Sequence, residues 1–189
     1  TDGDGLRQAD AGVLDGVTLD GDMLLNGYGA TLEVRNGLTL ANGHRLVLQG
    51  VSWGSVVNFT GASQTLGGSG EVVFTGTNAN STLQANLDAG QTLTIGAGIT
   101  VHGGADGQGG QIQANSAVLN LGVIAADAYG QAVTLRGSGL TNAGTLAART
   151  GGSLWLNGNY TTAHLGTLSN DGAGAIYLGG TLDNSGATL

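Results

Sequence analysis

The chain has 189 residues and a formal net charge of −8, with 38 glycines and neither cysteine nor proline. This balance excludes a nucleic-acid partner, because binding a phosphate backbone needs a basic face that five arginines without any lysine cannot form. The lack of cysteine excludes disulfide frames and thiolate zinc sites. No apolar run approaches the roughly 20 residues that span a bilayer, which argues against membrane insertion.

The N-terminal end is acidic. We expect residues 1–12 to form a loose end and residues 13–189 to form a single solenoid domain. Asp2, Asp4 and Asp10 place hard oxygen ligands near glycines, a pattern that makes calcium the one cofactor worth considering. The pattern departs from the EF-hand form, and the alternative, a solvated acidic end, is the interpretation that we favour.

Short β-strand patterns follow from Gly16 onward. Runs such as 17–19, 23–25 and 31–34 alternate or are short, and each is soon followed by glycine or asparagine. Residues 31–40 also match residues 92–101 at an offset of 61, which is close to three turns of roughly 20 to 22 residues each. This offset indicates that the front half keeps the rhythm of a solenoid, which a β-sandwich has no reason to keep.

A repeated phrase in the last third of the chain gives the clearest period. A phrase that begins with glycine occurs at Gly122, Gly144 and Gly166, which gives a regular period of about 22 residues. A repeat this short cannot bury its own apolar face and has to stack on its neighbours. The sequence therefore predicts an all-β parallel β-helix, or β-solenoid, with eight to nine turns of about 20–27 residues.

The same period assigns side chains to faces. The residues expected to point inward, in stacked structural ladders, are Val133, Leu135, Leu154, Leu156, Ile176, Leu178, Ile124, Leu146 and Leu168. Because strand residues alternate faces, Trp155 and Tyr177 should point outward as neighbours on successive turns. With Tyr160 and Tyr129 from adjoining turns, they form a candidate ligand or glycan surface. The alternative is that they are ordinary lateral strand residues, packed on each other.

One further register position carries charges. Asp127, Arg149 and Asp171 should occupy the same place in three successive turns, with the acids about 9 to 10 Å apart, near the spacing that an inverting glycosidase uses. A solvated salt-bridge ladder is the favoured alternative, since the arginine keeps both acids ionised. The three histidines lie far apart in sequence, which argues against a shared metal. We therefore assign no catalytic, cofactor-binding or metal-ligating residue.

Several phrases carry a family resemblance. These are GVTLDGDM (16–23), ATLEVRNGLTL (30–40), QTLTIGAGITV (91–101), GLTNAGTLAA (139–148) and GGTLDNSGATL (179–189). They look like the β-strand repeats of very large bacterial surface and exported proteins, the filamentous-haemagglutinin-like and autotransporter-type adhesins, and the likeness covers most of residues 13–189. The resemblance implies a right-handed parallel β-helix in an extracellular or surface-attached bacterial protein.

These observations favour a structural or adhesive role. We expect a stiff spacer or display rod that is not an enzyme and that forms a segment of a longer chain. Its partners would be other segments of that chain and a host or environmental surface or glycan. The competing hypothesis is an extracellular carbohydrate-binding module or a polysaccharide-degrading β-helix enzyme.

Overall fold

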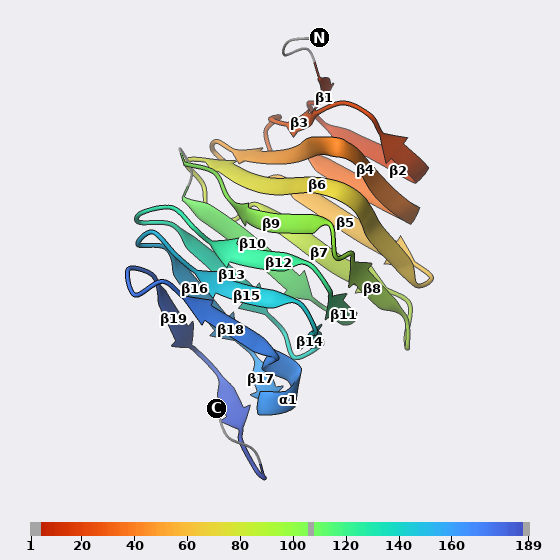
Figure 1. The fold of residues 1–189 in the computed structure, drawn as a ribbon. Coiled ribbons are helices and arrows are strands. Elements are labelled where there is room, and N and C mark those ends of the chain that lie inside the picture. Colours follow the sequence, from red (N-terminus) through yellow and green to blue (C-terminus); the bar gives the residue numbers. More distant parts are fainter. Residues whose placement is uncertain (1–4, 106–107, 187–189) are drawn as a thin grey trace.

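The computed structural model describes residues 5–105 and 108–186, which form a β-solenoid (Figure 1). Parallel strands stack turn upon turn in three ladders, and each turn passes through ladder 1, ladder 2 and ladder 3 in that order. The predicted all-β parallel solenoid is therefore confirmed. The one described helix, α1 (Thr162–Leu165), is a single short turn. No helix in the described ranges is long and apolar enough to cross a membrane.

Ladders 1 and 3 run the length of the solenoid. Ladder 1 joins its strands through seven parallel pairings, and ladder 3 does the same. Ladder 1 contains the first parts of β2 (Ala11–Leu19) and β4 (Thr31–Gly50), then β5 (Val56–Gly61), β7 (Thr82–Leu87), β10 (Gly109–Ala114), β13 (Ala132–Arg136), β16 (Ser153–Asn157) and β19 (Ala175–Leu178). Ladder 3 contains β1 (Leu6–Gln8), β3 (Met23–Leu25), the last parts of β4 and β6 (Gln64–Gly76), then β9 (Ile99–Gly103), β12 (Val123–Ala126), β15 (Thr145–Ala148) and β18 (Thr167–Asn170).

Ladder 2 is shorter. It takes the end of β2, the middle of β4 and the start of β6, followed by β8 (Thr92–Ile95), β11 (Ala117–Asn120) and β14 (Leu140–Asn142). Near the C-terminal end, β17 (Asn159–Thr161) pairs with β20 (Thr181–Asp183). Strand pairing starts at Leu6, so the solenoid begins before the expected boundary at residue 13.

The number of turns is lower than the eight to nine expected. Seven steps along ladder 1 make about seven turns, stacked over about 34 Å, and the steps in the middle of the chain are the long ones. After a short first step from Ala11 to Thr31, ladder 1 steps from Thr31 to Val56 and then to Thr82. At the back it steps from Ser153 only as far as Ala175. Because each of these middle turns uses more of the chain, fewer turns fit into its length.

The long front strand β4 shows how the chain turns without proline. It crosses all three ladders, and it bends at Asn36-Gly37 and at Asn42-Gly43, where all four residues have positive φ. Glycine and asparagine tolerate this left-handed conformation better than other residues. Each asparagine side chain also donates to an acid of the preceding turn, Asn36 to Asp15 and Asn42 to Asp20.

The core consists of inward columns of apolar side chains. The structure places the nine expected ladder residues in three columns, in which Val133, Leu135 and Ile124 each pair with the expected partner one turn on. All are buried except in the last described turn, where Ile176 and Leu168 are half-buried and Leu178 is 47% exposed. The column of Leu135 continues forward through Ile112 to Leu83.

Candidate functional site

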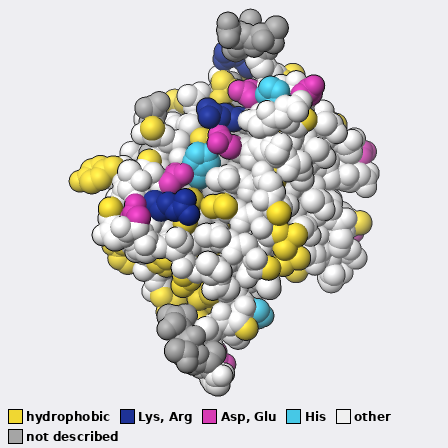
Figure 2. All heavy atoms as spheres, viewed as in Figure 1, with side chains coloured by type: hydrophobic (Ala, Val, Ile, Leu, Met, Phe, Trp, Pro, Cys, Tyr) yellow, Lys and Arg dark blue, Asp and Glu magenta, His cyan; other side chains and the backbone are white. Residues whose placement is uncertain are grey.

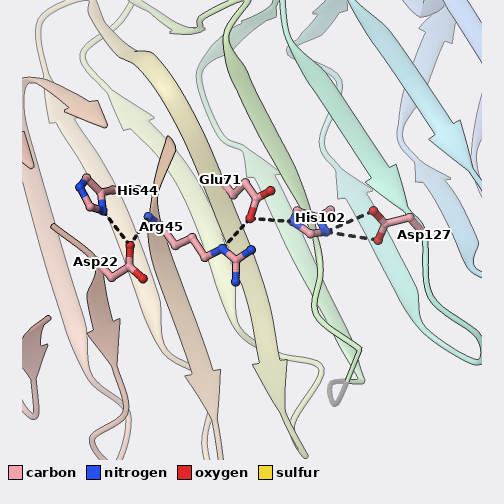
Figure 3. A network of polar contacts seen from close by, with 6 residues as sticks. All are labelled: Asp22, His44, Arg45, Glu71, His102 and Asp127. Atoms are coloured by element: carbon pink, nitrogen blue, oxygen red, sulfur yellow. Dashed lines mark hydrogen bonds and ion pairs between the residues drawn. The ribbon is translucent and has the colours of Figure 1, made fainter. Parts of the chain in front are cut away.

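Charged side chains gather on the outer face of ladder 3. Figure 2 shows acidic, basic and histidine side chains following one another in a band down one face of the molecule. The best-connected part of this band links His102 to the two acids Glu71 and Asp127, and Glu71 to Arg45 (Figure 3). Because these residues come from β4, β6, β9 and the segment after β12, the contacts connect four successive turns.

His102 lies between two carboxylates. Its Nδ1 is 3.2 Å from Asp127 Oδ2, and its Nε2 is 3.8 Å from Glu71 Oε2. The hydrogen bond to Asp127 raises the pKa of His102 above its ordinary value, and the charges of Asp127 and Glu71 act in the same direction against the opposing effect of burial. The geometry therefore favours an imidazolium that holds three turns together through opposite charges.

The hollow around His102 is lined by charged side chains that contact one another across the turns. It measures about 320 Å³ and its lining includes Arg45, Glu71, His102 and Asp127. Glu71 Oε2 is already 2.7 Å from Arg45 Nε, and the Nε2 of His102 is buried without a hydrogen bond. A general base must reach its substrate's proton with a free lone pair. This cluster is better suited to connecting turns than to proton transfer.

The N-terminal part of the band is held separately. Asp22 Oδ1 is 3.1 Å from His44 Nδ1 and accepts a hydrogen bond of 2.9 Å from the backbone nitrogen of Arg45. The bond from Arg45 is the main reason that the pKa of Asp22 is lowered, with further contributions from His44. His44 and His102 do not share a ligand position. Among the described residues there is no group of three or more metal-binding side chains that could hold an ion.

Asp127, Arg149 and Asp171 do not form the expected salt-bridge ladder. The three residues do follow β12, β15 and β18 at one register position. However, Asp127 contacts His102, while Asp171 accepts hydrogen bonds from the backbone nitrogens of Thr150, Ala173 and Gly174. Among the residues that the structure describes, neither acid lies within ion-pair distance of Arg149. Asp171 is bonded to backbone nitrogens of the turns and Asp127 to His102, so both acids have partners other than Arg149.

Comparison with known proteins returns no match. No family model, no curated protein and no solved structure is detectably similar to this chain.

The aromatic residues that the sequence singles out are divided between surface and core. Trp155 and Tyr177 pair across β16 and β19 and are stacked, with ring centroids 4.3 Å apart and planes at 17°. They are 37% and 42% exposed, and Tyr129 is 90% exposed. Tyr160 is 2% exposed and therefore does not belong to a surface, contrary to expectation. Burial raises the pKa of Tyr160 to about 12.

The stacking of Trp155 on Tyr177 limits what this pair offers. Each ring covers one flat face of the other, so that face is not available to a ligand. The alternative raised from the sequence, that these residues pack on each other, therefore describes their mutual contact. Their outward position is as expected, and a role in ligand binding stays a prediction.

A second aromatic pair was missed by the sequence reasoning. Tyr28 and Trp53 lie in the loops that lead from ladder 3 to ladder 1, here called the aromatic corner, which comprises residues 26–30, 51–55 and 127–131. Their ring centroids are 6.0 Å apart with planes tilted by 58°, and they are 76% and 61% exposed. The available signal was a large aromatic residue within a Ser/Gly-rich turn, since such a residue has no strand face to bury it.

Most of the suggested calcium site lies outside the residues that the structure describes. Asp2 and Asp4 lie outside the described residues, and Asp10 is exposed before β2.

The raised pKa of His102 predicts a pH-dependent stability. A raised pKa in the folded state means that protonation favours folding, so the contribution is complete below about pH 6.5 and is lost as the pH rises through the folded-state value. Between about pH 6 and pH 8 we expect the free energy of unfolding to fall by on the order of 1 kcal/mol. Urea unfolding at several pH values measures this dependence.

Two histidine substitutions show whether His102 is the source of this pH dependence. His102→Gln should flatten the pH dependence, whereas His164→Gln, at an exposed position on α1, should leave it as in the parent. An unchanged pH dependence in His102→Gln would show that the ion pairs of His102 do not contribute.

Proposed function

We propose that this chain is a stiff spacer or display rod within an exported or surface-attached bacterial protein, and that it is not an enzyme. One observation carries the proposal: ladders 1 and 3 each continue through seven parallel pairings over a continuous apolar interior. Each turn is held by its neighbours on both sides, so the stack resists bending and extends in length with each added turn. The resemblance of the repeat phrases to bacterial adhesin repeats supports the location.

The described surface supports a mechanical role over a catalytic one. The titratable side chains of the charged band are committed to contacts between turns, as with Arg45 to Glu71 and His102 to Asp127. The proposed partners are accordingly the neighbouring segments of a longer chain and the surface that such a chain meets.

The proposal predicts that whole turns can be added. Residues 132–152 form one turn, because Ala132 pairs with Ser153. Three extra copies inserted after residue 152 should lengthen the particle by about 14 Å, since each turn adds about 4.8 Å. Small-angle scattering gives the length, and thermal unfolding should stay cooperative.

The matched control inserts three copies of residues 132–147, which do not complete a turn. These copies put inward residues out of register and should disrupt the fold. Whole-turn insertion that fails to fold, or that folds without lengthening, contradicts a modular rod.

Antibody labelling of intact cells of the source organism tests location, and labelling that requires permeabilised cells contradicts a surface position.

A further inference from the structure

The exposed aromatic residues of this chain are not scattered. Five of its eight Trp, Tyr and Phe residues are exposed. Three of them, Tyr28, Trp53 and Tyr129, lie in the aromatic corner, and the other two lie on the outer face of ladder 1, in strands β16 and β19. Exposing large rings costs free energy that burial would recover. Their collection along one edge therefore calls for a function.

Trp53 is the best placed of these residues, because it has a support on one side and a hollow on the other. Tyr28, one turn earlier, contacts the indole at a tilt. On the other side a hollow of about 500 Å³ opens between Trp53 and the loop of the following turn, where Asn78 and Asn80 lie. This volume lies within the range of small-ligand sites.

The hollow is held in shape by bonds between turns. Thr77 and Asn78 donate to the carbonyl oxygens of Val51 and Ser52, at 2.9 Å in each case. At Gly54 a side chain would collide with the backbone of Asn80, so this glycine lets the two loops approach each other. The loop that carries Trp53 is therefore tied to the next turn by two hydrogen bonds and lies close against it at Gly54.

The lining has a distinct chemistry. It comprises Ser52, Trp53, Gly54, Val56, Asn78 and Asn80, with no charged side chain among them. A flat ring next to carboxamides and a hydroxyl matches a sugar, which has an apolar C–H face and a rim of hydroxyl groups. Asn80 is exposed, and while its Oδ1 accepts from Gln111, its amide nitrogen donates to no other described residue. This nitrogen can donate to hydroxyl groups, whereas the side-chain amide of Asn78 already donates to Ser52 O and accepts from the backbone nitrogen of Asn80.

We propose that the hollow between Trp53 and Asn80 is a binding site for a neutral saccharide, with a sugar ring stacked on the indole and a hydroxyl group bonded to the side-chain amide of Asn80. The lack of charge in the lining argues against an acidic sugar. The small extent of the hollow argues against a protein partner, since a stable interface needs about 800 Å² on each side. The site is independent of the spacer role, because a rod can carry it or lack it.

The chain contains two tryptophans, which allows a direct test. In a Trp155→Phe variant, Trp53 is the one remaining tryptophan, so its fluorescence reports on the hollow alone. We expect a saturable change on titration with at least one of the neutral hexasaccharides of glucose, mannose and galactose, up to millimolar concentration, and no change with oligogalacturonate. A flat titration with every neutral saccharide overturns the proposal.

Calorimetry with the saccharide that binds then locates the site. Trp53→Ala should weaken binding by about tenfold or more, because truncating a central aromatic anchor removes most of the contact. Tyr28→Ala should have a smaller effect, since this ring supports the indole from behind, and Leu121→Ala, at an exposed apolar position away from the aromatic residues, is the control that should bind as the parent does. Unchanged binding in Trp53→Ala overturns the assignment.

Trp53 fluorescence also distinguishes saccharide binding from association between copies of the protein. A change in Trp53 fluorescence that follows protein concentration without added sugar would indicate contact between copies and would overturn saccharide binding as the role of this hollow. The length of the insertion variants tests the rod, and the saccharide titration tests the hollow. Failure of one proposal therefore does not decide the other.

Discussion

Leu83→Asp should abolish the cooperative unfolding transition of this protein. Leu83 is fully buried at the centre of ladder 1, where it stacks between Val57 and Ile112 on the adjacent turns. A carboxylate at this position has no partner in the inward column, and burying it costs more than about 4 kcal/mol. In a solenoid the two halves are joined through such central turns, so the loss should not be confined to one end. Circular dichroism during thermal unfolding measures it.

Two further variants separate burial from the charge itself. Gln84→Asp places the same acid at the next position, on the outer face of β7, and should change stability by less than about 0.5 kcal/mol. Leu178→Asp lies in the same column as Leu83 but in the last described turn, where the side chain is 47% exposed. We expect it to loosen that turn and leave the rest folded. A Leu83→Asp protein that melts like the parent would contradict the inward column.

The back half of the solenoid could be predicted because its loops are nearly constant in length. Val133, Leu154 and Ile176 follow one another at almost equal spacing, and the structure pairs them in one column. With a constant step, alternation along a strand decides which side chains point inward. The outward placement of Trp155 and Tyr177 follows from the same argument.

The front half could not be registered in this way. The 61-residue offset aligned Leu32 with Leu93, yet Leu32 lies in ladder 1 and Leu93 in ladder 2. Ladder 2 steps from Leu38 to Leu66 and then to Ile95, and both steps are longer than any step between the turns at the back. Longer loops between similar strands shift the period, and similar strand phrases then match across different faces. This mismatch also led to too many turns.

The charged band and the pair of Tyr28 and Trp53 could not be predicted either, because both depend on the register of the front half. The contact between His102 and Glu71 needs β6 and β9 to be adjacent, and no repeated phrase marks the step that joins them. Tyr28 and Trp53 lie in the corner loops of successive turns, where strand alternation gives no direction for a side chain. The sequence could show which residues were unusual, but their neighbours depended on the lengths of loops elsewhere in the chain.

Gly144→Ala should destabilise the protein by about 3 kcal/mol. Glycine in a repeated phrase commonly serves a left-handed turn, and Gly166 does have a φ of 52°. At Gly122 and Gly144, however, φ is not positive, and the need is for space. A methyl group on Gly144 would overlap the carbonyl oxygen of Gly122 and lie 2.6 Å from the carbonyl carbon of Leu121.

The clash at Gly144 is with backbone, so no side-chain rotation relieves it. Thr145 N donates to Gly122 O at 2.9 Å, and Gly144 N donates to Asn120 O at 2.9 Å, so moving the strand away breaks bonds between turns. Gly21→Ala is the matched control, because a methyl group there meets no atom within 4 Å, and it should change stability by less than about 0.5 kcal/mol. Urea unfolding of both variants compares them. Equal stability of the two variants would contradict a need for space at Gly144, whereas a large difference means that the glycine sets how closely successive turns approach.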